Sequence, residues 1–355
     1  MAIFTYNDIS ITGMSACVPA RVVDNRFFSD FFSDEDVTKV VQMTGISHRR
    51  WADSSLAASD LGYNAGQTLM DAMEVKPAEV DGLIFCSVTP DYRMPATSFI
   101  LQDRMGLGRS TLCFDLNMGC SGFVYALNLA YSILSSTDLK RIMLVNSHII
   151  MNEIAKKDRA TSLLFGDGAT ATMIEKRDGD TSAGTSYLSA HTDGAGYEFI
   201  IKPGGAYRNP TSAETLRDKV RSDGSIRNDE QASMDGPAIF DFTITEVPKD
   251  ISNLMAFAGK SVDEIDHFVL HQANLFIMKH IGRKLKVPMD KIPVSLDKYG
   301  NLSSVSLPLT IVSELAESLN GLKKTLLLSA FGVGLSWGSA VITLDHPVIV
   351  PIVEI

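Results

Sequence analysis

The sequence predicts an α/β protein built from two topologically similar halves. Short apolar segments rich in β-branched residues alternate with helical patterns, which is typical of buried sheets covered by helices. The same order of elements occurs twice, because the strand and helix at 81–105 have counterparts at 266–285. The strand, glycine-containing turn and helix around Cys120 likewise have counterparts around Asn301. We therefore expect two halves that face each other.

The predicted elements divide the chain into four parts. Strands are expected at 83–88, 112–116, 142–146, 268–270 and 325–328, and helices at 96–105, 120–134 and 275–285. We assign 1–175 to the N-terminal half and 236–347 to the C-terminal half. Residues 176–235 are rich in Gly, Asp, Ser and Pro with little periodicity, which predicts an insertion or lid rather than a third core. The apolar tail 348–355 is expected to pack on the body of the protein or on a partner subunit.

The composition is that of an ordinary globular protein, with 45% hydrophobic and 21% charged residues among 355. The net charge of −10, spread along the chain, argues against a non-specific grip on nucleic acid or an anionic membrane. No stretch approaches the ~20 apolar residues of a membrane span, and the first residues lack a secretory signal pattern, so we expect a cytoplasmic protein. The four cysteines form no C-x-x-C pair, so neither disulfides nor a structural metal site are expected.

Cys120 is the predicted nucleophile. The run Gly119-Cys120-Ser121-Gly122 reads as a tight turn between a strand and a helix, so the positive helix end and free backbone N–H groups would stabilise a thiolate. The two glycines would let an acyl group approach the sulfur and leave the Cys120 N–H facing a developing oxyanion. The alternative is a buried structural cysteine. We interpret three other cysteines in that way: Cys17, Cys86 and Cys113.

His271 and Asn301 are the predicted partners of Cys120. His271 follows the strand 267–270, at the carboxyl end where α/β sheets place their ligands. Asn301 lies in the turn that corresponds to the Cys120 turn of the first half. Taken alone, a histidine is more often structural and such an asparagine only part of a turn. If the halves pack around a pseudo-twofold axis, all three side chains come from strand ends and can converge.

A glycine-rich segment at 331–338 superficially resembles a nucleotide-binding loop. It lies between two predicted strands, no helix opens after it, and no acidic residue stands at the expected distance. We therefore expect this segment to supply a backbone donor to an oxyanion instead.

Together these motifs resemble the β-ketoacyl-acyl carrier protein synthase III family of the thiolase-like superfamily, and the likeness runs almost end to end. The matching motifs, in order, are Thr44-Gly45-Ile46, Gly119-Cys120-Ser121-Gly122-Phe123, Phe165-Gly166-Asp167-Gly168-Ala169, His271-Gln272-Ala273-Asn274, Tyr299-Gly300-Asn301 and Phe331 to Gly338. Agreement of so many separate motifs makes the signal strong where each alone would be weak. The resemblance implies a five-layered αβαβα sandwich that is usually a homodimer.

The resemblance also implies roles for individual residues. Cys120 would carry the acyl group, while His271 and Asn301 hold the thioester carbonyl of a malonyl-type extender as it loses CO2. The resulting carbanion would attack the Cys120 thioester and give a β-ketoacyl product. Two neutral donors aimed at one carbonyl would stabilise the enolate, each by about 2–4 kcal/mol. The N–H groups of Cys120 and Val333 would form a second oxyanion hole.

Substrate contacts follow from the same resemblance. Phe165 would wall the acyl pocket, and Met94 falls where the family sends a residue into the partner subunit's pocket. Arg159 matches the arginine that reaches the phosphates of coenzyme A, and Asn274 is assigned to the pantetheine arm. No permanently bound cofactor is implied, since thioesters of coenzyme A or acyl carrier protein, including malonyl-acyl carrier protein, are the substrates.

The chain departs from the family at the outer end of this site. Lys39 and Met43 stand where well-studied members carry the Trp and Arg that sandwich the coenzyme's adenine. The insertion before Met234 suggests a specialised donor pocket.

A basic cluster near one predicted helix is the expected docking site for an acidic carrier protein. Its residues are Lys279, Arg283, Lys284 and Lys286. The simpler interpretation is a solvated helix face, and Phe276, where an arginine is often found, weakens the docking hypothesis.

Three other functions compete with decarboxylative condensation. An acyltransferase that uses an oxygen, nitrogen or other carbon nucleophile would keep Cys120 and His271 but release no CO2 from a malonyl thioester. A cysteine peptidase is disfavoured because the residues around Cys120 lack the C-G-S-C-[WY] signature. An inactive structural subunit of a heteromeric synthase would commonly have lost the nucleophile. Acyl chain length, starter, the choice between coenzyme A and carrier protein as donor, and the pathway stay open.

Overall fold

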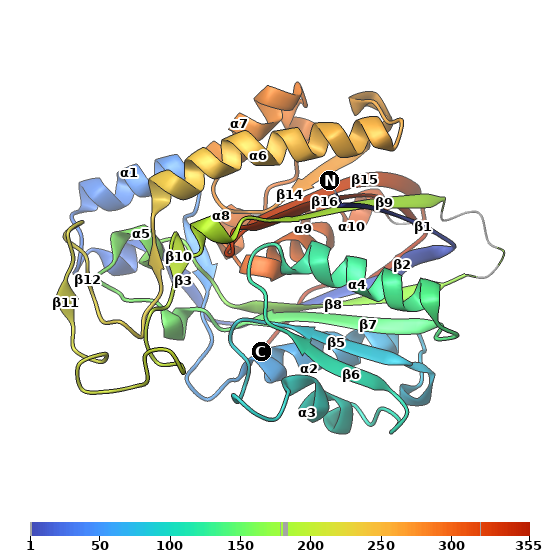
Figure 1. Cartoon of the computed structure of the whole chain (residues 1–355), viewed down its shortest axis with the longest axis horizontal. Coiled ribbons are helices and arrows are strands. Elements are labelled where there is room, and N and C mark those ends of the chain that lie inside the picture. Colours follow the sequence, from blue (N-terminus) through green and yellow to red (C-terminus); the bar gives the residue numbers. More distant parts are fainter. Residues whose placement is uncertain (1, 178, 180–183, 320) are drawn as a thin grey trace.

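Two mixed β-sheets form the centre of the molecule (Figure 1). The computed structural model describes residues 2–177, 179, 184–319 and 321–355. The seven-stranded sheet has the order β17-β2-β8-β7-β5-β6, with β18 also on β2, and comprises β2 (Ile9–Val18), β5 (Gly82–Cys86), β6 (Leu112–Leu116), β7 (Arg141–His148), β8 (Gly168–Lys176), β17 (Val348–Ile349) and β18 (Val353–Glu354). The five-stranded sheet has the order β1-β9-β16-β15-β14 and comprises β1 (Ala2–Asn7), β9 (Thr185–Thr192), β14 (His267–Leu270), β15 (Lys323–Gly332) and β16 (Ser336–Asp345).

Both sheets repeat the same succession of pairings. β5 is parallel to β7, β7 is antiparallel to β8, and β8 is antiparallel to β2. In the other sheet β14 is parallel to β15, β15 is antiparallel to β16, and β16 is antiparallel to β9. The two similar halves predicted from the repeated order of elements are therefore present.

Helices cover the outer faces of both sheets and fill the space between them (Figure 1). The helices are α1 (Asp34–Thr44), α2 (Ala58–Ala72), α3 (Thr97–Arg104), α4 (Gly122–Ser136), α5 (Arg159–Ser162), α6 (Gly236–Phe257), α7 (Leu275–Leu285), α8 (Leu296–Tyr299), α9 (Ser306–Glu314) and α10 (Ala316–Leu319). α2 and α3 pack on the seven-stranded sheet, α4 and α9 lie between the sheets, and α6 and α7 cover the five-stranded sheet. The predicted five-layered αβαβα sandwich is confirmed.

The two middle helices are apolar on nearly every face because a sheet covers each side of them. Phe123 and Leu127 of α4 and Leu307 and Leu309 of α9 are fully buried in one core shared by both sheets. A helix with apolar residues all round is expected only in such a doubly covered position. This layer fixes the start of α4, and with it the turn that contains Cys120.

The structure corrects the predicted boundaries of the insertion. β8 runs to Lys176, and β9, which falls inside the interval 176–235, is a core strand between β1 and β16. β1 also belongs to the sheet of the second half, although it lies in the interval assigned to the first. The sequence pattern missed β9 because its buried face is partly serine: Ser189 donates its hydroxyl to Asp250 of α6 at 3.0 Å. Positions 178 and 180–183 of the interval lie outside the described residues.

The inserted segment is therefore 199–235. It contains two short antiparallel pairs, which are β10 (Ile200–Ile201) with β13 (Ser233–Met234) and β11 (Lys219–Val220) with β12 (Ile226–Arg227). A third pair outside the main sheets joins β3 (Val22–Asp24) to β4 (His48–Arg50). In Figure 1 the insertion and α1 lie at the same end of the molecule.

The tail adds to the edge of the seven-stranded sheet. β17 and β18 both pair in parallel with β2, and Glu354 forms an ion pair with Arg50 at 2.7 Å. Across the described ranges, no helix combines the length and the apolar character that crossing a bilayer requires.

Candidate active site

A pocket of about 1110 Å³ opens between α1, the insertion and the helices α6 and α7. Its lining includes Cys120, His271 and Asn301, which are at most 6% exposed, together with side chains that reach the surface. We call the outer part the pocket mouth and define it by three exposed lining residues: Phe31, Met43 and Phe276. The residues predicted from two separate halves thus share one cavity, with the polar groups at its buried end.

Cys120 lies between β6 and α4, and several hydrogen-bond donors surround its sulfur. The Ser303 hydroxyl is 3.8 Å from Sγ, and the backbone N–H groups of Val333 and Cys120 also point to it. Burial raises the pKa of the Cys120 thiol, while these three donors act to lower it. The sequence suggested a thiolate stabilised by the helix end. The structure instead shows that desolvation outweighs the donors, so the thiol is protonated until a substrate binds or a base removes its proton.

Gly332 makes the closest approach to the nucleophile. A Cβ at this position would lie 2.8 Å from Cys120 Cβ and 3.0 Å from its sulfur. The two glycines that the sequence assigned to substrate access have other neighbours. A Cβ on Gly122 would meet the sulfur of Cys86 at 2.6 Å, and one on Gly119 would meet Val333 at 3.2 Å. Gly119 and Gly122 allow close packing of the turn, whereas the absence of a side chain at Gly332 keeps the space beside the Cys120 sulfur open.

His271 directly follows β14, and no charged side chain among the described residues pairs with it. Its backbone N–H donates to Ser329 at 2.8 Å, and its ring packs edge-on against Phe331 at 5.3 Å. Burial lowers the pKa of His271 to about 3, so the imidazole is neutral near pH 7. Within the described part of the chain its Nδ1 has no hydrogen-bond partner. A neutral imidazole facing a pocket is suited to donate a hydrogen bond to a substrate oxygen.

Asn301 lies in the turn after α8 rather than at a strand end. Its backbone N–H donates to Leu164 at 2.9 Å, and its carbonyl accepts from Gly166 at 3.2 Å. The side-chain oxygen accepts the Ser303 N–H at 2.9 Å. Because that oxygen is occupied, the NH2 group is the part of Asn301 available to a substrate carbonyl.

Arg49 supports this turn from behind and was not anticipated from the sequence. Its buried guanidinium donates to the carbonyl oxygens of Ser162 and Phe165 at 2.5 and 3.1 Å. Burial lowers the pKa of Arg49 to about 9. The segment that it holds is the one paired with the Asn301 backbone.

Ser303 is a second residue that sequence reasoning missed. It connects two predicted catalytic groups, because its N–H holds Asn301 and its O–H contacts Cys120. It begins the short 3-10 helix η8 (Ser303–Val305) with φ at 54°. A serine in a Ser-Ser run after an asparagine turn reads as part of the turn, so no sequence signal pointed to it.

Replacing Ser303 with Ala is expected to slow acylation of Cys120 by about tenfold, on the order of 1–2 kcal/mol for one lost hydrogen bond to a charged group. The hydroxyl lowers the pKa of the thiol, so its removal raises that pKa and moves the pH–rate profile of acylation to higher pH. The rate of acyl-enzyme formation between pH 6 and 10 measures this. Ser135→Ala, which removes an exposed hydroxyl of α4, is the control. If the pH–rate profile of acylation is not shifted in Ser303→Ala, the Ser303 hydroxyl does not act on the Cys120 thiol.

The comparisons with known proteins agree with this geometry. The profile described as 3-oxoacyl-[acyl-carrier-protein (ACP)] synthase III matches residues 114–194, and the profile of the C-terminal part of that family matches residues 255–344. The β-ketoacyl-[acyl-carrier-protein] synthase III of Syntrophomonas wolfei is 34% identical over 332 residues, which cover 93% of this chain and 96% of that protein. The chain belongs to the 3-oxoacyl-[acyl-carrier-protein] synthase III family.

Solved structures of synthase III proteins share the fold. A 3-oxoacyl-(acyl-carrier protein) synthase from Burkholderia xenovorans superposes with a TM-score of 0.93 at 38% identity, covering 100% of this chain and 99% of that one. The synthase III of Pseudomonas aeruginosa gives 0.80 at 26% identity, covering 97% and 100%. The fold and family inferred from the motifs are therefore confirmed.

The remaining predicted contacts of this synthase III family member fall in different places. Phe165, Arg159 and Asn274 all line the pocket. The Asn274 side chain caps α7 by accepting the Ile277 N–H at 2.8 Å, so its first role is structural. Met94 is 77% exposed and lines no part of this chain's own pocket.

The predicted basic cluster is present on α7 and just after it. Lys279, Arg283 and Lys286 are exposed and form no ion pair with any residue in the described ranges. Lys284 donates to the Ile244 carbonyl at 2.9 Å. The same helix contributes Phe276 of its first turn to the pocket mouth, whereas Lys284 and Lys286 line a separate pocket beside residues 252–262.

Proposed function

We propose that the chain is a condensing enzyme of the β-ketoacyl-[acyl-carrier-protein] synthase III type. The observation that supports it most is the shared pocket, in which a buried thiol with backbone donors faces two neutral polar side chains. A thiol alone would serve any acyl transfer. A decarboxylation that forms an enolate requires hydrogen-bond donors aimed at the enolate oxygen, and two neutral side chains can supply them.

The proposed reaction has two stages. In the first, the Cys120 sulfur attacks the donor thioester carbonyl, a new thioester forms, and the donor thiol leaves with the proton. The backbone N–H groups of Cys120 and Val333 stabilise the oxyanion. In the second, a malonyl-type thioester loses CO2, and the electron pair of the broken C–C bond moves into an enolate whose oxygen His271 and Asn301 hold. The enolate carbon then attacks the acyl carbon and expels the Cys120 thiolate.

No electron is gained or lost in either stage, so the proposal includes no resident cofactor. The substrates are acyl thioesters of coenzyme A or of a carrier protein and a malonyl thioester of a carrier protein. The cations of Lys279, Arg283 and Lys286, on or just after the helix that contributes Phe276 to the pocket mouth, support docking of an acidic carrier protein on this helix.

Mass spectrometry after incubation with a panel of acyl thioesters tests the first stage. We expect a mass gain equal to one acyl group, which is lost in Cys120→Ala. Addition of a malonyl thioester labelled in the free carboxyl group tests the second stage, with labelled CO2 and a β-ketoacyl thioester as the expected products. An acyl-enzyme that discharges to an oxygen or nitrogen nucleophile without CO2 release would replace this proposal with the non-decarboxylating acyltransferase.

We further propose that the chain forms a homodimer. β6 is the terminal strand of its sheet, and exposed apolar side chains surround it: Tyr92, Met94, Phe99 and Leu112. Several exposed apolar side chains near a sheet edge favour contact with another copy. Light scattering should give the mass of a dimer for the native chain and a monomer for Met94→Asp. A native chain that stays monomeric at micromolar concentration contradicts the dimer.

A further inference from the structure

The insertion forms a fixed wall of the pocket mouth rather than a loose flap. Asp158, which is fully buried, accepts the Ser225 hydroxyl at 3.3 Å and Arg227 at 3.2 Å. The Ile226 N–H donates to the Lys157 carbonyl at 3.3 Å. These contacts seat the turn between β11 and β12 on the N-terminal end of α5. The seated turn contributes its residues 223–226 to the pocket lining.

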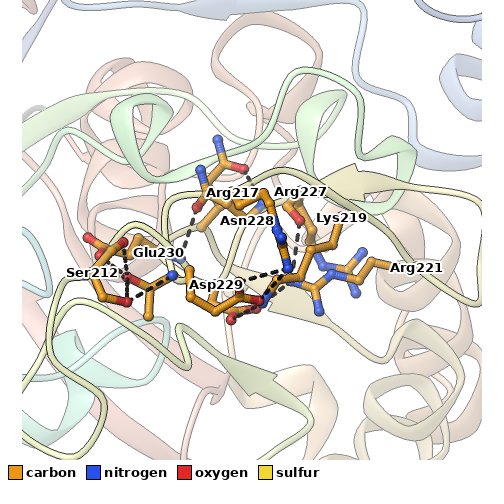
Figure 2. A network of polar contacts seen from close by, with 11 residues as sticks. Ser212, Arg217, Lys219, Arg221, Arg227, Asn228, Asp229 and Glu230 are labelled. Carbon is orange, nitrogen blue, oxygen red and sulfur yellow. Dashed lines mark hydrogen bonds and ion pairs between the residues drawn. The ribbon is translucent and has the colours of Figure 1, made fainter.

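A compact polar network within the insertion keeps that turn in shape (Figure 2). Asp229 pairs with Lys219 at 2.7 Å and with Arg221 at 2.5 Å. Glu230 accepts the Thr215 hydroxyl at 2.7 Å, which joins the chain just before β11 to the chain just after β12. Several linked charges of this kind are stabilising where a single exposed pair is not. The wall therefore presents the same groups to every substrate.

Three of the cations around the pocket mouth already pair with an acidic side chain. Arg159 pairs with Asp36 of α1 at 3.1 Å. Arg227 pairs with both Asp158 and Asp223 at 3.2 Å. The single lysine of α1, Lys39, pairs with Glu35 at 2.6 Å. A polyphosphate would have to break these pairs in order to gain any of these three cations.

The charged side chains that line the pocket also sum to zero. Lys157 and Arg159 supply two positive charges, and Asp30 and Asp223 supply two negative ones, so 2 − 2 = 0. Of the two cations, only Lys157 has no ion pair among the described residues. Coenzyme A brings roughly four negative charges on three phosphate groups, whereas a pantetheine arm on a carrier protein brings about one. A neutral rim on a protein of net charge −10 is unfavourable for the first ligand and tolerates the second.

We propose that this pocket mouth selects against the nucleotide end of coenzyme A, so that the acyl group reaches Cys120 on the pantetheine arm of a carrier protein. The inference rests on the proposed function, since it identifies the donor in the first stage. The insertion supplies one acidic group of the rim, Asp223, and the segment before α1 supplies the other, Asp30. Lys279 and Arg283, which form no ion pair with any residue in the described ranges, lie on the helix that contributes Phe276 to the mouth and are available to the carrier.

The test compares one acyl group on three donors, which are acyl-pantetheine, acyl-coenzyme A and an acyl carrier protein. The second-order rate of Cys120 acylation is measured for each by mass spectrometry. We expect the carrier protein to react fastest and acyl-coenzyme A to be no faster than acyl-pantetheine, although it contains the same arm. Because salt screens the repulsion, the rate with acyl-coenzyme A should rise relative to acyl-pantetheine as ionic strength increases.

The variant Asp30→Asn with Asp223→Asn should raise the ratio of the acyl-coenzyme A rate to the acyl-pantetheine rate by about 3- to 10-fold. Asp218→Asn, an exposed residue of the same insertion that does not line the pocket, is the matched control. Native acyl-coenzyme A reacting several-fold faster than acyl-pantetheine overturns the inference and leaves the proposed function intact. Failure of all three donors to label Cys120 overturns both.

Discussion

His271→Ala is expected to lower the decarboxylation of a malonyl thioester by about 10²–10³-fold while Cys120 is still acylated. The buried imidazole faces the pocket as a neutral group, and it is assigned to the enolate rather than to the sulfur. Removing one preorganised donor to a developing oxyanion costs on the order of 3–4 kcal/mol. In the proposed mechanism the first stage depends on the backbone donors of Cys120 and Val333, which this substitution leaves in place.

Measuring the two stages separately checks this assignment. Acyl-enzyme formation is followed by mass spectrometry, and CO2 release is followed from a labelled malonyl thioester. Because burial lowers the pKa of His271 to about 3, its neutral form dominates above pH 4, so it should contribute no acidic limb to the decarboxylation rate between pH 5 and 7. Asn301→Ala should behave as His271→Ala does, with Cys120 still acylated and a similar loss of decarboxylation. Equal loss of both stages in His271→Ala would mean that the imidazole acts on the sulfur instead.

Gly332→Ala is expected to reduce acylation of Cys120 by at least about tenfold, or to destabilise the fold by about 1–3 kcal/mol if the nucleophile turn shifts to make room. The added Cβ would stand 2.8 Å from Cys120 Cβ, and the backbone of Gly332 has φ at 155°. At that separation either the methyl group or the Cys120 turn must move. The neighbouring Val333 N–H, which points to the sulfur, would move with it.

Thermal unfolding and the acylation rate together measure this effect. Gly194→Ala is the matched control, because a Cβ there meets no atom within 4 Å. We expect the control to keep native stability and rate. A Gly332→Ala protein with both native stability and a native acylation rate would show that Gly332 does not shape the space beside the sulfur.

Local pattern was enough to predict the architecture of this protein. Buried strands such as β5 and β14 consist of short runs of apolar residues, and the helices between the sheets are longer segments that are apolar on nearly every face, so the alternation of the two along the chain located them. The exception is β9, whose buried face contains serine. The contact that makes such a strand stable is with Asp250 of α6, about 60 residues away, and no local pattern reports it.

The sequence by itself also singled out Cys120, His271 and Asn301, because each stands at a turn that the repeat places near the other half. Only the tertiary structure decided how these groups are tuned. Burial raises the pKa of Cys120 although its hydrogen-bond donors act to lower it, and burial lowers the pKa of His271 to about 3. Both shifts depend on how much water the surrounding residues exclude, which only the packed structure determines. The contacts of Ser303, Gly332 and the insertion were equally invisible, since they join residues that are distant in the chain.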